Sequence, residues 1–461
     1  MDEDFFNNDI IERFEQMLES KERLYFETDE FYEIIVYYLD VCDYPYAKKA
    51  ILYALEIHPY STEIKVKKLE YLLAIGQLKE AYYLIEELKE VETTDVDYLI
   101  CIAQYWSLKE DSKRAIQYYE KALELEEEKE FIYNCIGNEY LNLNDVFNAL
   151  DSFKKSLELD LDDDFAFYSC IHCYEELHLR EECLEFVQEY IEKSPYSDMA
   201  WTELGKQYWK IKDYENALRA YDFAVIINSK SIYSHNQKAA CLEKLEDYEE
   251  AINVYQEILE FDDTAAYTYL NIGNCYLKLN KPIKALNSFH QAIHEDPQLD
   301  IAWEKASDLY ESIGNYEEAL YYLNRALELE EFKLDYLKKR THLYIKLNRL
   351  EEAANEYLQI VKIEPTVFNN WLGLDEILIV LGQYQKATET IQNGLNYFNR
   401  AEFYYQLSVC YLFLGEDRKA KNAFKTANKM NPELQLEMFQ KYPVLEKINK
   451  FSLKKILKRK K

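Results

Sequence analysis

A period of 34 residues runs through most of this chain. Small side chains recur at this spacing, and one residue is dropped only before the last of them. The series consists of Ala47, Ala81, Ala115, Ala149, Cys183, Ala217, Ala251, Ala285, Ala319, Ala353, Ala387 and Ala420. Because chance does not keep register over so many copies, the pattern predicts an array of equal structural repeats and not several unrelated domains.

The positions of each repeat, numbered as slots 1 to 34, predict two amphipathic helices joined by a short turn. Apolar residues at slots 4, 7, 8 and 11 fall on one helical face, and the small residue at slot 20 lets the second helix approach the first closely. Proline at slot 32 ends the second helix. Gly76, Gly314, Gly382 and Gly415 occupy slot 15, where we expect a positive φ in the turn.

Two repeats show a recognisable signature most clearly. One carries Trp201, Leu204, Gly205, Tyr208, Ala217, Tyr221 and Ala224, and the other Tyr269, Ile272, Gly273, Tyr276, Ala285, Phe289, Ala292 and Pro297. This pattern resembles the tetratricopeptide repeat family, whose signature is Trp-Leu-Gly-Tyr followed by Ala-Phe-Ala-Pro. The resemblance implies an all-α fold, an α-solenoid of about twelve 34-residue helix-turn-helix repeats forming a right-handed superhelix. Larger residues stand at slot 8 in Ile35, Leu69 and Ile171, and there we expect looser local packing.

The predicted organisation is a capped array followed by a charged tail. Stacked helical repeats need solubilising ends, and Phe14 and Leu436 are among the side chains expected to cover the first and last repeat. The predicted parts are an N-terminal capping helix (1–27), twelve repeats (28–434, starting at 28, 62, 96, 130, 164, 198, 232, 266, 300, 334, 368 and 401), a C-terminal capping segment (435–446) and a basic tail (447–461).

Composition argues against several classes of protein. The formal charge of −32 at pH 7 argues against nucleic acid as a partner. The start, MDEDFFNNDIIERF, lacks the basic and apolar regions of a secretory signal, and no stretch approaches 18 uncharged apolar residues. Nine cysteines without a disulfide-like framework suit a reducing compartment. We therefore expect a cytoplasmic protein, with the inner face of a membrane as the alternative location.

One segment, CIHCYEELHLREEC, suggests a metal site. It carries Cys170, His172, Cys173, His178 and Cys183, and Cys-x-x-Cys with a nearby histidine is a zinc pattern. The repeat register offers a second explanation, because these cysteines fill slots that pack in other repeats, and buried cysteine behaves as a small apolar residue. We favour packing over metal binding.

Other candidate chemistry is sparse. His290 and His294 are spaced i, i+4 and suit a shared cation, but they lie late in a second helix, a face that is usually exposed in the family. No glycine-rich phosphate loop or nucleophile elbow is present. We expect no enzyme activity, no metal, no cofactor and no small-molecule substrate.

The resemblance implies that slots 2, 5, 9, 12 and 13 line a concave groove. In the central repeats we expect a protein or peptide partner to contact these slots, because rings supply anchor area and asparagine pairs with backbone amides. The alternative is that some of these rings pack between repeats. The candidates are Phe131, Asn134, Asn138, Phe165, Tyr168, His172, Thr202, Lys206, Trp209, Asn236, Tyr267 and Asn274. No repeat has Lys at slot 5 with Asn at slot 9, which argues against docking of acidic chaperone tails.

The basic tail is a second candidate surface. Its cations are Lys447, Lys450, Lys454, Lys455, Lys458, Arg459, Lys460 and Lys461. Contact with the protein's own acidic surface, anionic lipid and RNA are all open to it. The favoured function is a non-catalytic scaffold or adaptor that supports assembly or regulation of a complex. The alternative is a peripheral membrane or envelope-machinery accessory recruited by the tail.

Overall fold

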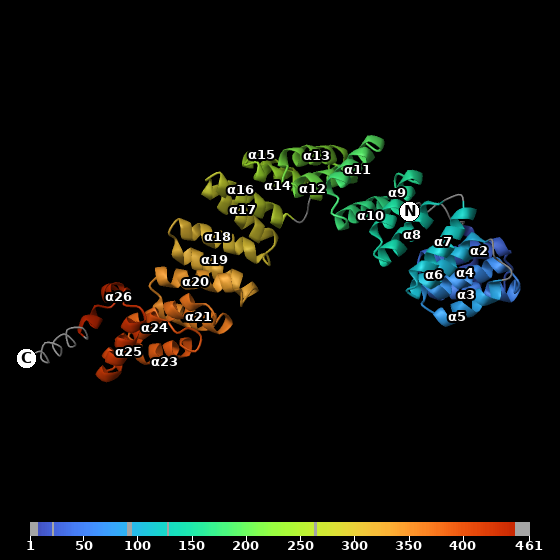
Figure 1. The fold of residues 1–461 in the computed structure, drawn as a ribbon. Helices are drawn as coiled ribbons and strands as arrows, with labels where there is room; N and C mark the ends of the chain where they lie inside the picture. The colour runs from blue at the N-terminus through green and yellow to red at the C-terminus, as the bar shows by residue number, and fades with distance from the viewer. Residues whose placement is uncertain (1–7, 21–22, 90–94, 127–128, 262–264, 448–461) are drawn as a thin grey trace, which may run out of the picture. The chain divides into compact units, whose positions relative to one another are not determined.

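The structure is a computed structural model that describes residues 8–20, 23–89, 95–126, 129–261 and 265–447. Within these ranges the chain forms 26 α-helices, one short 3-10 helix and no strand (Figure 1). The all-α class and the helical-repeat architecture are confirmed. The chain divides into two compact units, Met1–Gln207 and Tyr208–Lys461, called the N-terminal and C-terminal units below.

The first helix of every repeat is 13 residues long and starts at slot 1. In the N-terminal unit these helices are α2 (Thr28–Asp40), α4 (Thr62–Ala74), α6 (Val96–Leu108), α8 (Glu130–Asn142) and α10 (Asp164–Glu176), and α12 (Asp198–Lys210) contains the boundary between the units. In the C-terminal unit they are α14 (Ile232–Lys244), α16 (Ala266–Lys278), α18 (Asp300–Ser312), α20 (Leu334–Lys346), α22 (Phe368–Val380) and α24 (Ala401–Phe413).

The second helices all start at slot 17. They are α3 (Tyr44–Ile57), α5 (Leu78–Leu88), α7 (Ser112–Leu125), α9 (Val146–Leu159) and α11 (Arg180–Lys193) in the N-terminal unit. In the C-terminal unit they are α13 (Tyr214–Ile227), α15 (Tyr248–Ile258), α17 (Pro282–Glu295), α19 (Tyr316–Leu329), α21 (Leu350–Ile363), α23 (Tyr384–Gly394) and α25 (Asp417–Met430). The flanking elements are α1 (Asn8–Ser20), α26 (Gln435–Lys441) and the 3-10 helix η1 (Pro443–Leu445).

The turn between the two helices is the same in all twelve repeats. The slot-15 residue always has a positive φ, which satisfies the last carbonyl groups of the first helix. The four predicted glycines adopt it, and so do Cys42, Glu110, Asn144, His178, Lys212, Glu246, Asn280 and Asn348. At slot 16, the side chains of Asp43, Asp111, Asp145, Asp213 and Asp247 accept a hydrogen bond from a backbone N–H of the second helix.

The core is built repeat by repeat from slots 8, 20 and 24. Eleven alanines of the 34-residue series are 0% exposed and Cys183 is 1% exposed, so the second helix packs closely on the first. Where slot 8 is glycine, slot 24 is a ring: a Cβ added to Gly137 would lie 2.6 Å from Phe153, and one added to Gly273 would lie 2.4 Å from Phe289.

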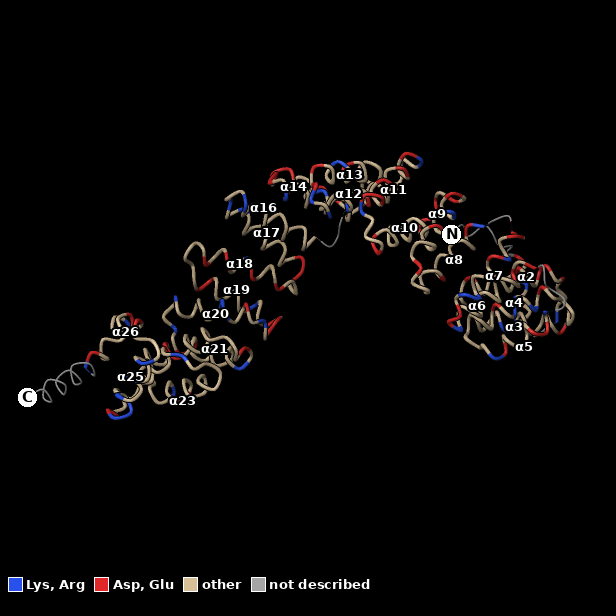
Figure 2. Tube along the Cα trace, in the orientation of Figure 1, with Lys and Arg blue, Asp and Glu red and all other residues tan. Residues whose placement is uncertain are grey.

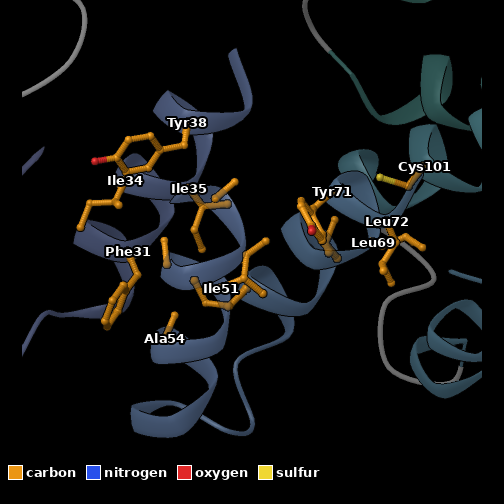
Figure 3. Packing of buried hydrophobic residues seen from close by; sticks show 14 of the residues in the cluster. Phe31, Ile34, Ile35, Tyr38, Ile51, Ala54, Leu69, Tyr71, Leu72 and Cys101 are labelled. Atoms are coloured by element: carbon orange, nitrogen blue, oxygen red, sulfur yellow. The ribbon is translucent and has the colours of Figure 1, made fainter. Parts of the chain in front are cut away.

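The expectation of looser packing at the large slot-8 residues is wrong. Ile35 and Leu69 are 0% exposed and Ile171 is 5% exposed. In these repeats slot 24 is aliphatic: Ile51 belongs to the same buried cluster as Ile35 (Figure 3), and Val187 is likewise buried. A smaller partner across the two helices makes room for the larger slot-8 residue.

Both ends of the array are covered by further elements. In α1, Ile10, Ile11, Phe14 and Met17 are buried, and the Phe14 ring meets the Phe26 ring edge-on at 6.0 Å. At the other end, the covering side chains are Met438 and Leu445, whereas Leu436 is 74% exposed. The prediction for Leu436 is wrong because the helical period places residue 438, and not 436, on the side of α26 that joins the core of the last repeats. None of the described helices is both long and apolar enough to cross a membrane.

Candidate functional site

Slot 2 carries an apolar side chain in six consecutive repeats. In the N-terminal unit these residues are Phe131, Phe165 and Met199, and in the C-terminal unit they are Tyr233, Tyr267 and Ile301. We call them the slot-2 apolar residues. Phe131, Phe165, Tyr233 and Tyr267 are between 47% and 62% exposed, Ile301 is 37% exposed, and Met199 is half-buried. They stand in the first turn of the first helix, and the core leaves much of their surface uncovered.

The other six repeats carry polar residues at the same slot. These residues are Asp29, Glu63, Asp97, Asp335, Asn369 and Glu402. An acidic residue in the first turn of a helix interacts favourably with the helix dipole. The change from acid to ring or aliphatic side chain is confined to the central repeats, so the repeat fold itself does not require it.

In the N-terminal unit, the repeats that carry slot-2 apolar residues also present a further exposed ring and a cation. The Phe165 ring meets Phe153 edge-on at 6.0 Å, so it is held in place while half of its surface stays exposed. Tyr168, one turn further along α10, is 44% exposed, and Lys206 Nζ lies 5.9 Å from the centre of its ring. Partial burial raises the pKa of the Tyr168 hydroxyl. Tyr168 therefore remains a neutral hydrogen-bonding group at physiological pH.

The polar candidates of the N-terminal unit fall into two groups. Asn138 and His172 are exposed. Asn134 is engaged inside the array: its Nδ2 donates to Asp163 Oδ2 at 2.5 Å, and Asp163 also accepts from the backbone N–H of Ala166. Asn134 thereby joins α8 to the start of α10, and its second amide atom, Oδ1, is buried without a hydrogen-bond partner.

Lys206 and Thr202 lie on α12 and are half-buried. Lys206 Nζ is 3.0 Å from Glu203 Oε2, and Gln207 donates to Glu203 Oε1 at 2.7 Å. The ammonium group is therefore balanced by a buried carboxylate of its own helix.

The candidates of the C-terminal unit differ in how much surface they leave open. Tyr267 is 62% exposed, and Asn274, two turns along the same helix, is half-buried. Asn236 Nδ2 donates to the Ile232 carbonyl of its own helix at 3.0 Å. The Trp209 ring meets Tyr214 edge-on at 5.0 Å, so Trp209 packs on the second helix of its own repeat.

In the first repeats, internal ion pairs occupy the corresponding positions. Lys67 is 8% exposed and lies 2.9 Å from Asp97 and 3.1 Å from Glu70, with its Nζ 4.9 Å from the Tyr32 ring centre. This network ties α2, α4 and α6 together and pairs the ammonium group of Lys67 with two carboxylates.

A similar network joins α18 and α20. Lys339 Nζ lies 2.6 Å from Asp308 Oδ1 and also pairs with Glu304. Burial alone would raise the pKa of Glu304, but the hydrogen bond and charge of Lys339 outweigh it and the pKa is lowered. For Asp308, burial and the charge of Glu304 raise the pKa. An adjoining cleft of about 360 Å³ is lined by Asp308, Glu311, Ser312, Tyr316, His342 and Lys346.

The cysteine-rich segment is packed into the repeat core. Cys170, Cys173 and Cys183 are at most 1% exposed, whereas His172 and His178 are exposed. Burial raises the pKa of the Cys173 thiol to about 11, so the thiolate that binds zinc is disfavoured. Among the described residues, no group of three potential ligands is placed to hold a metal ion.

The two histidines of α17 have separate surroundings. His290 stacks on Tyr322 with ring centres 5.5 Å apart, and its Nε2 lies 2.8 Å from the Tyr322 hydroxyl. His294 is exposed beside Glu295. The structure does not bring the two imidazoles together on a shared cation.

Comparison with known families follows the same repeat pattern. Two sequence models described as "Tetratricopeptide repeat" match this chain, one at residues 266–299 and the other at 104–129, 232–264, 301–332, 342–367 and 401–434. This chain is a tetratricopeptide repeat protein.

The individual similarities are partial. A search of curated proteins finds human "Protein O-mannosyl-transferase TMTC3", 28% identical over 109 residues, which cover 23% of this chain and 12% of that protein. Among solved structures, YrrB, described as "a TPR protein with an unusual peptide-binding site", is 20% identical, with 41% of this chain and 98% of that chain covered and a TM-score of 0.35. The Cut9–Hcn1 hetero-tetramer structure is 12% identical, with 90% and 92% covered and a TM-score of 0.33.

Sequence reasoning about this tetratricopeptide repeat protein missed three slot-2 residues. Met199, Tyr233 and Ile301 share the slot of Phe131, Phe165 and Tyr267, and aligning slot 2 across all twelve repeats would have found them. The tail candidates from Lys450 onward lie outside the described residues, and Lys447 is exposed at their boundary.

Proposed function

We propose that this tetratricopeptide repeat protein is a non-catalytic scaffold. It holds a protein or peptide partner against the first helices of its central repeats and thereby supports assembly or regulation of a complex. Tetratricopeptide repeats serve protein interaction in general. The observation that carries the proposal for this chain is the run of six slot-2 apolar residues flanked by repeats with polar residues at that slot.

The physical argument concerns surface that folding leaves uncovered. A ring that stays about half exposed gains only part of the roughly 25 cal/mol per Å² available from burying apolar area. A partner that covers it supplies the remainder, and aromatic residues are the commonest energetic anchors of interfaces. Asn138 and Asn274 lie two turns after Phe131 and Tyr267 on the same face of their helices, so a partner that covers the rings can also pair its backbone with these amides.

The proposal is tested by matched variants within the C-terminal unit. The first variant carries Tyr233→Ser, Tyr267→Ser and Ile301→Ser. The control carries Ile226→Ser, Ile283→Ser and Tyr321→Ser, which remove comparably exposed apolar side chains from second helices. Because each anchor contributes about 1–2 kcal/mol, the first variant is expected to weaken partner binding by about a hundredfold or more, and the control is expected to bind as the original protein does.

A photo-crosslinking residue gives an independent measurement. Placed at position 267, it should label the same partner that the triple variant loses, whereas placed at position 283 it should not. Equal loss of the partner in both triple variants, or equal labelling from both positions, would contradict a role for the slot-2 apolar residues.

A further inference from the structure

The first helix of the last repeat, α24, is covered on a side that other repeats leave at least partly open. This side contains slots 5 and 9, where the family resemblance places the groove. Among the twelve first helices, which the described residues include in full, only α24 has both slots buried: Tyr405 is 0% and Val409 is 1% exposed. In α10, by contrast, Tyr168 and His172 at these slots are exposed. Another part of the chain therefore lies on this side of α24.

That part is the short stretch formed by α26 and η1. We call residues 435–445 the C-terminal segment. Its side chains Met438 and Leu445 are 4% and 0% exposed, and they belong to the same buried cluster as Tyr405 and Val409. The 3-10 helix η1 packs on α24. The C-terminal segment thus fills the apolar surface that slots 5 and 9 of α24 present.

The C-terminal segment also reaches the preceding repeat. Lys441 Nζ lies 2.5 Å from Oε1 of Glu376, which occupies slot 9 of α22. Burial raises the pKa of the neighbouring Tyr442 hydroxyl, and the charges of Glu376 and Asp375 raise it further, so the hydroxyl is neutral and lies close to α22. One short stretch of chain therefore presents a cation, a phenol and an aliphatic side chain to two consecutive repeats.

The closed arrangement leaves one buried acceptor unpaired. Asp375 is 0% exposed, and Thr390 donates to its Oδ1 at 2.5 Å. The other oxygen, Oδ2, has no hydrogen-bond partner among the described residues. A buried acceptor without a donor costs free energy. The C-terminal segment is therefore an imperfect occupant of the side of α22 and α24 that it covers.

Few interactions hold the C-terminal segment in place. Its helix α26 has 7 residues, which is too short for a helix to be stable by itself. The Lys441 and Glu376 side chains are 40% and 30% exposed, and an ion pair in contact with water contributes little. General charge attraction adds nothing, because residues 208–461 contain 37 acidic and 34 basic side chains, and Figure 2 shows the two kinds interspersed. Attachment therefore depends mainly on Met438, Tyr442 and Leu445.

We propose that the side of α22 and α24 under the C-terminal segment is a second peptide-binding surface, and that the segment is a built-in occupant which a partner displaces. The partner presents the chemistry of the present occupant: a cation for Glu376, followed by a phenol and an aliphatic side chain for Tyr405 and Val409. While the segment is bound, the partner's apparent affinity is reduced by the fraction of molecules in which the surface is open. These two repeats carry polar residues at slot 2, so the proposal is independent of the slot-2 apolar residues.

The test uses the full-length protein and a fluorescent peptide with the sequence of residues 435–447, QLEMFQKYPVLEK. In the variant Tyr442→Ala/Leu445→Ala, called the opened variant, the C-terminal segment loses two anchors that the peptide retains. The opened variant should bind the peptide at least about tenfold more tightly than the wild type does. The matched control is Leu436→Ala/Gln440→Ala, which changes two exposed residues of α26 and should bind as the wild type does.

Further substitutions locate the bound peptide. In the opened variant, Glu376→Gln should weaken peptide binding about two- to fivefold, because it removes the partner of the peptide's first lysine. A peptide with glutamine in place of this lysine should bind equally weakly, and Glu376→Gln should then cause no further loss. The single variant Lys441→Gln changes no buried side chain, and it should bind the original peptide about two- to fivefold more tightly than the wild type.

Equal affinity of the wild type, the opened variant and the control overturns the proposal. Additive losses from Glu376→Gln and from the glutamine of the peptide overturn it as well. Hydrogen exchange of residues 368–380 and 401–413 checks that α22 and α24 stay folded; if they unfold in the opened variant, the result for Lys441→Gln decides. A wild-type dimer that the opened variant does not form would assign the surface to the C-terminal segment of a second copy and would likewise overturn the proposal.

Discussion

Replacing Gly273 by alanine should destabilise the repeat formed by α16 and α17. The added Cβ would lie 2.4 Å from Cε1 and 2.6 Å from Cδ1 of Phe289, so the ring must move by roughly 1 Å to restore ordinary contact. Phe289 is 0% exposed and cannot move outward freely. Overpacking of this kind costs about 1–3 kcal/mol, whereas replacing a helical glycine by alanine stabilises by about 1 kcal/mol. The expected net loss of stability is therefore between about 0 and 2 kcal/mol.

A compensating substitution makes this prediction sharper. In the double variant Gly273→Ala/Phe289→Leu, the methyl group fills part of the space that the ring vacates, as Ile35 and Ile51 share space in their own repeat. The alanine should then be neutral or stabilising by about 1 kcal/mol relative to Phe289→Leu alone, which is a coupling energy of at least about 1 kcal/mol.

The measurement needs local resolution, because long repeat arrays do not always unfold in one step. Urea unfolding gives the overall change, and hydrogen exchange of peptides from residues 266–295 reports the stability of α16 and α17. A single variant that exchanges more slowly than the wild type would refute the reasoning. Strictly additive effects in the double variant would refute it too.

Three further predictions concern other parts of the molecule. Lys212→Gly and Glu246→Gly should each raise the free energy of unfolding by about 0.5–1 kcal/mol. The positive φ costs a non-glycine residue about 1–2 kcal/mol, and part of this gain is lost because glycine makes the unfolded chain more flexible. A loss of stability in urea unfolding would contradict this. Burial raises the pKa of Asp375 to about 8, so the stability contributed by its neutral form is complete below about pH 4 and is lost as the pH rises toward 8. Asp375→Asn should therefore have a higher melting temperature than the wild type at pH 8, and the difference should shrink at pH 5. A difference that does not depend on pH would contradict this prediction. Arg340 donates to both Glu356 oxygens at 2.8 and 3.0 Å, and Glu356 is 5% exposed. Arg340→Met leaves this carboxylate buried without its partner and should lower the free energy of unfolding by about 3 kcal/mol. The double variant Arg340→Met/Glu356→Leu should lose much less, as judged by urea unfolding.

The central candidate site was only partly predictable from sequence. Repeat register led to Phe131 and Tyr267, and both rings are exposed in the structure. It could not separate them from Asn134 or Trp209, which are used inside the array, because slot number does not reveal which neighbour a side chain meets. Which neighbour a side chain meets depends on the residues of the adjacent helix that lie opposite it.

The exposed side of α25, which carries Arg418, Lys421, Lys425 and Lys429, shows a different limit. The sequence contains these charges, but the repeat pattern predicts α25 only as a packing element, because Ala420 and Phe424 occupy core slots. Sequence reasoning therefore singled out the cations of the tail and not those of α25. The tertiary structure shows which side of α25 is occupied by the core, and hence that the cations share the side that remains.

The amino-acid sequence by itself determined the period, the all-α class, the positions of the two helices in each repeat and the small residues on which they pack. These features are local: they follow from side-chain size and periodicity within about 34 residues. Tertiary structure alone decided that Ile35 and Ile171 are well packed, that eight residues other than glycine adopt the positive φ of the turn, and which polar groups are already paired. These outcomes depend on volumes and partners that meet only when neighbouring helices come together, so no single position encodes them.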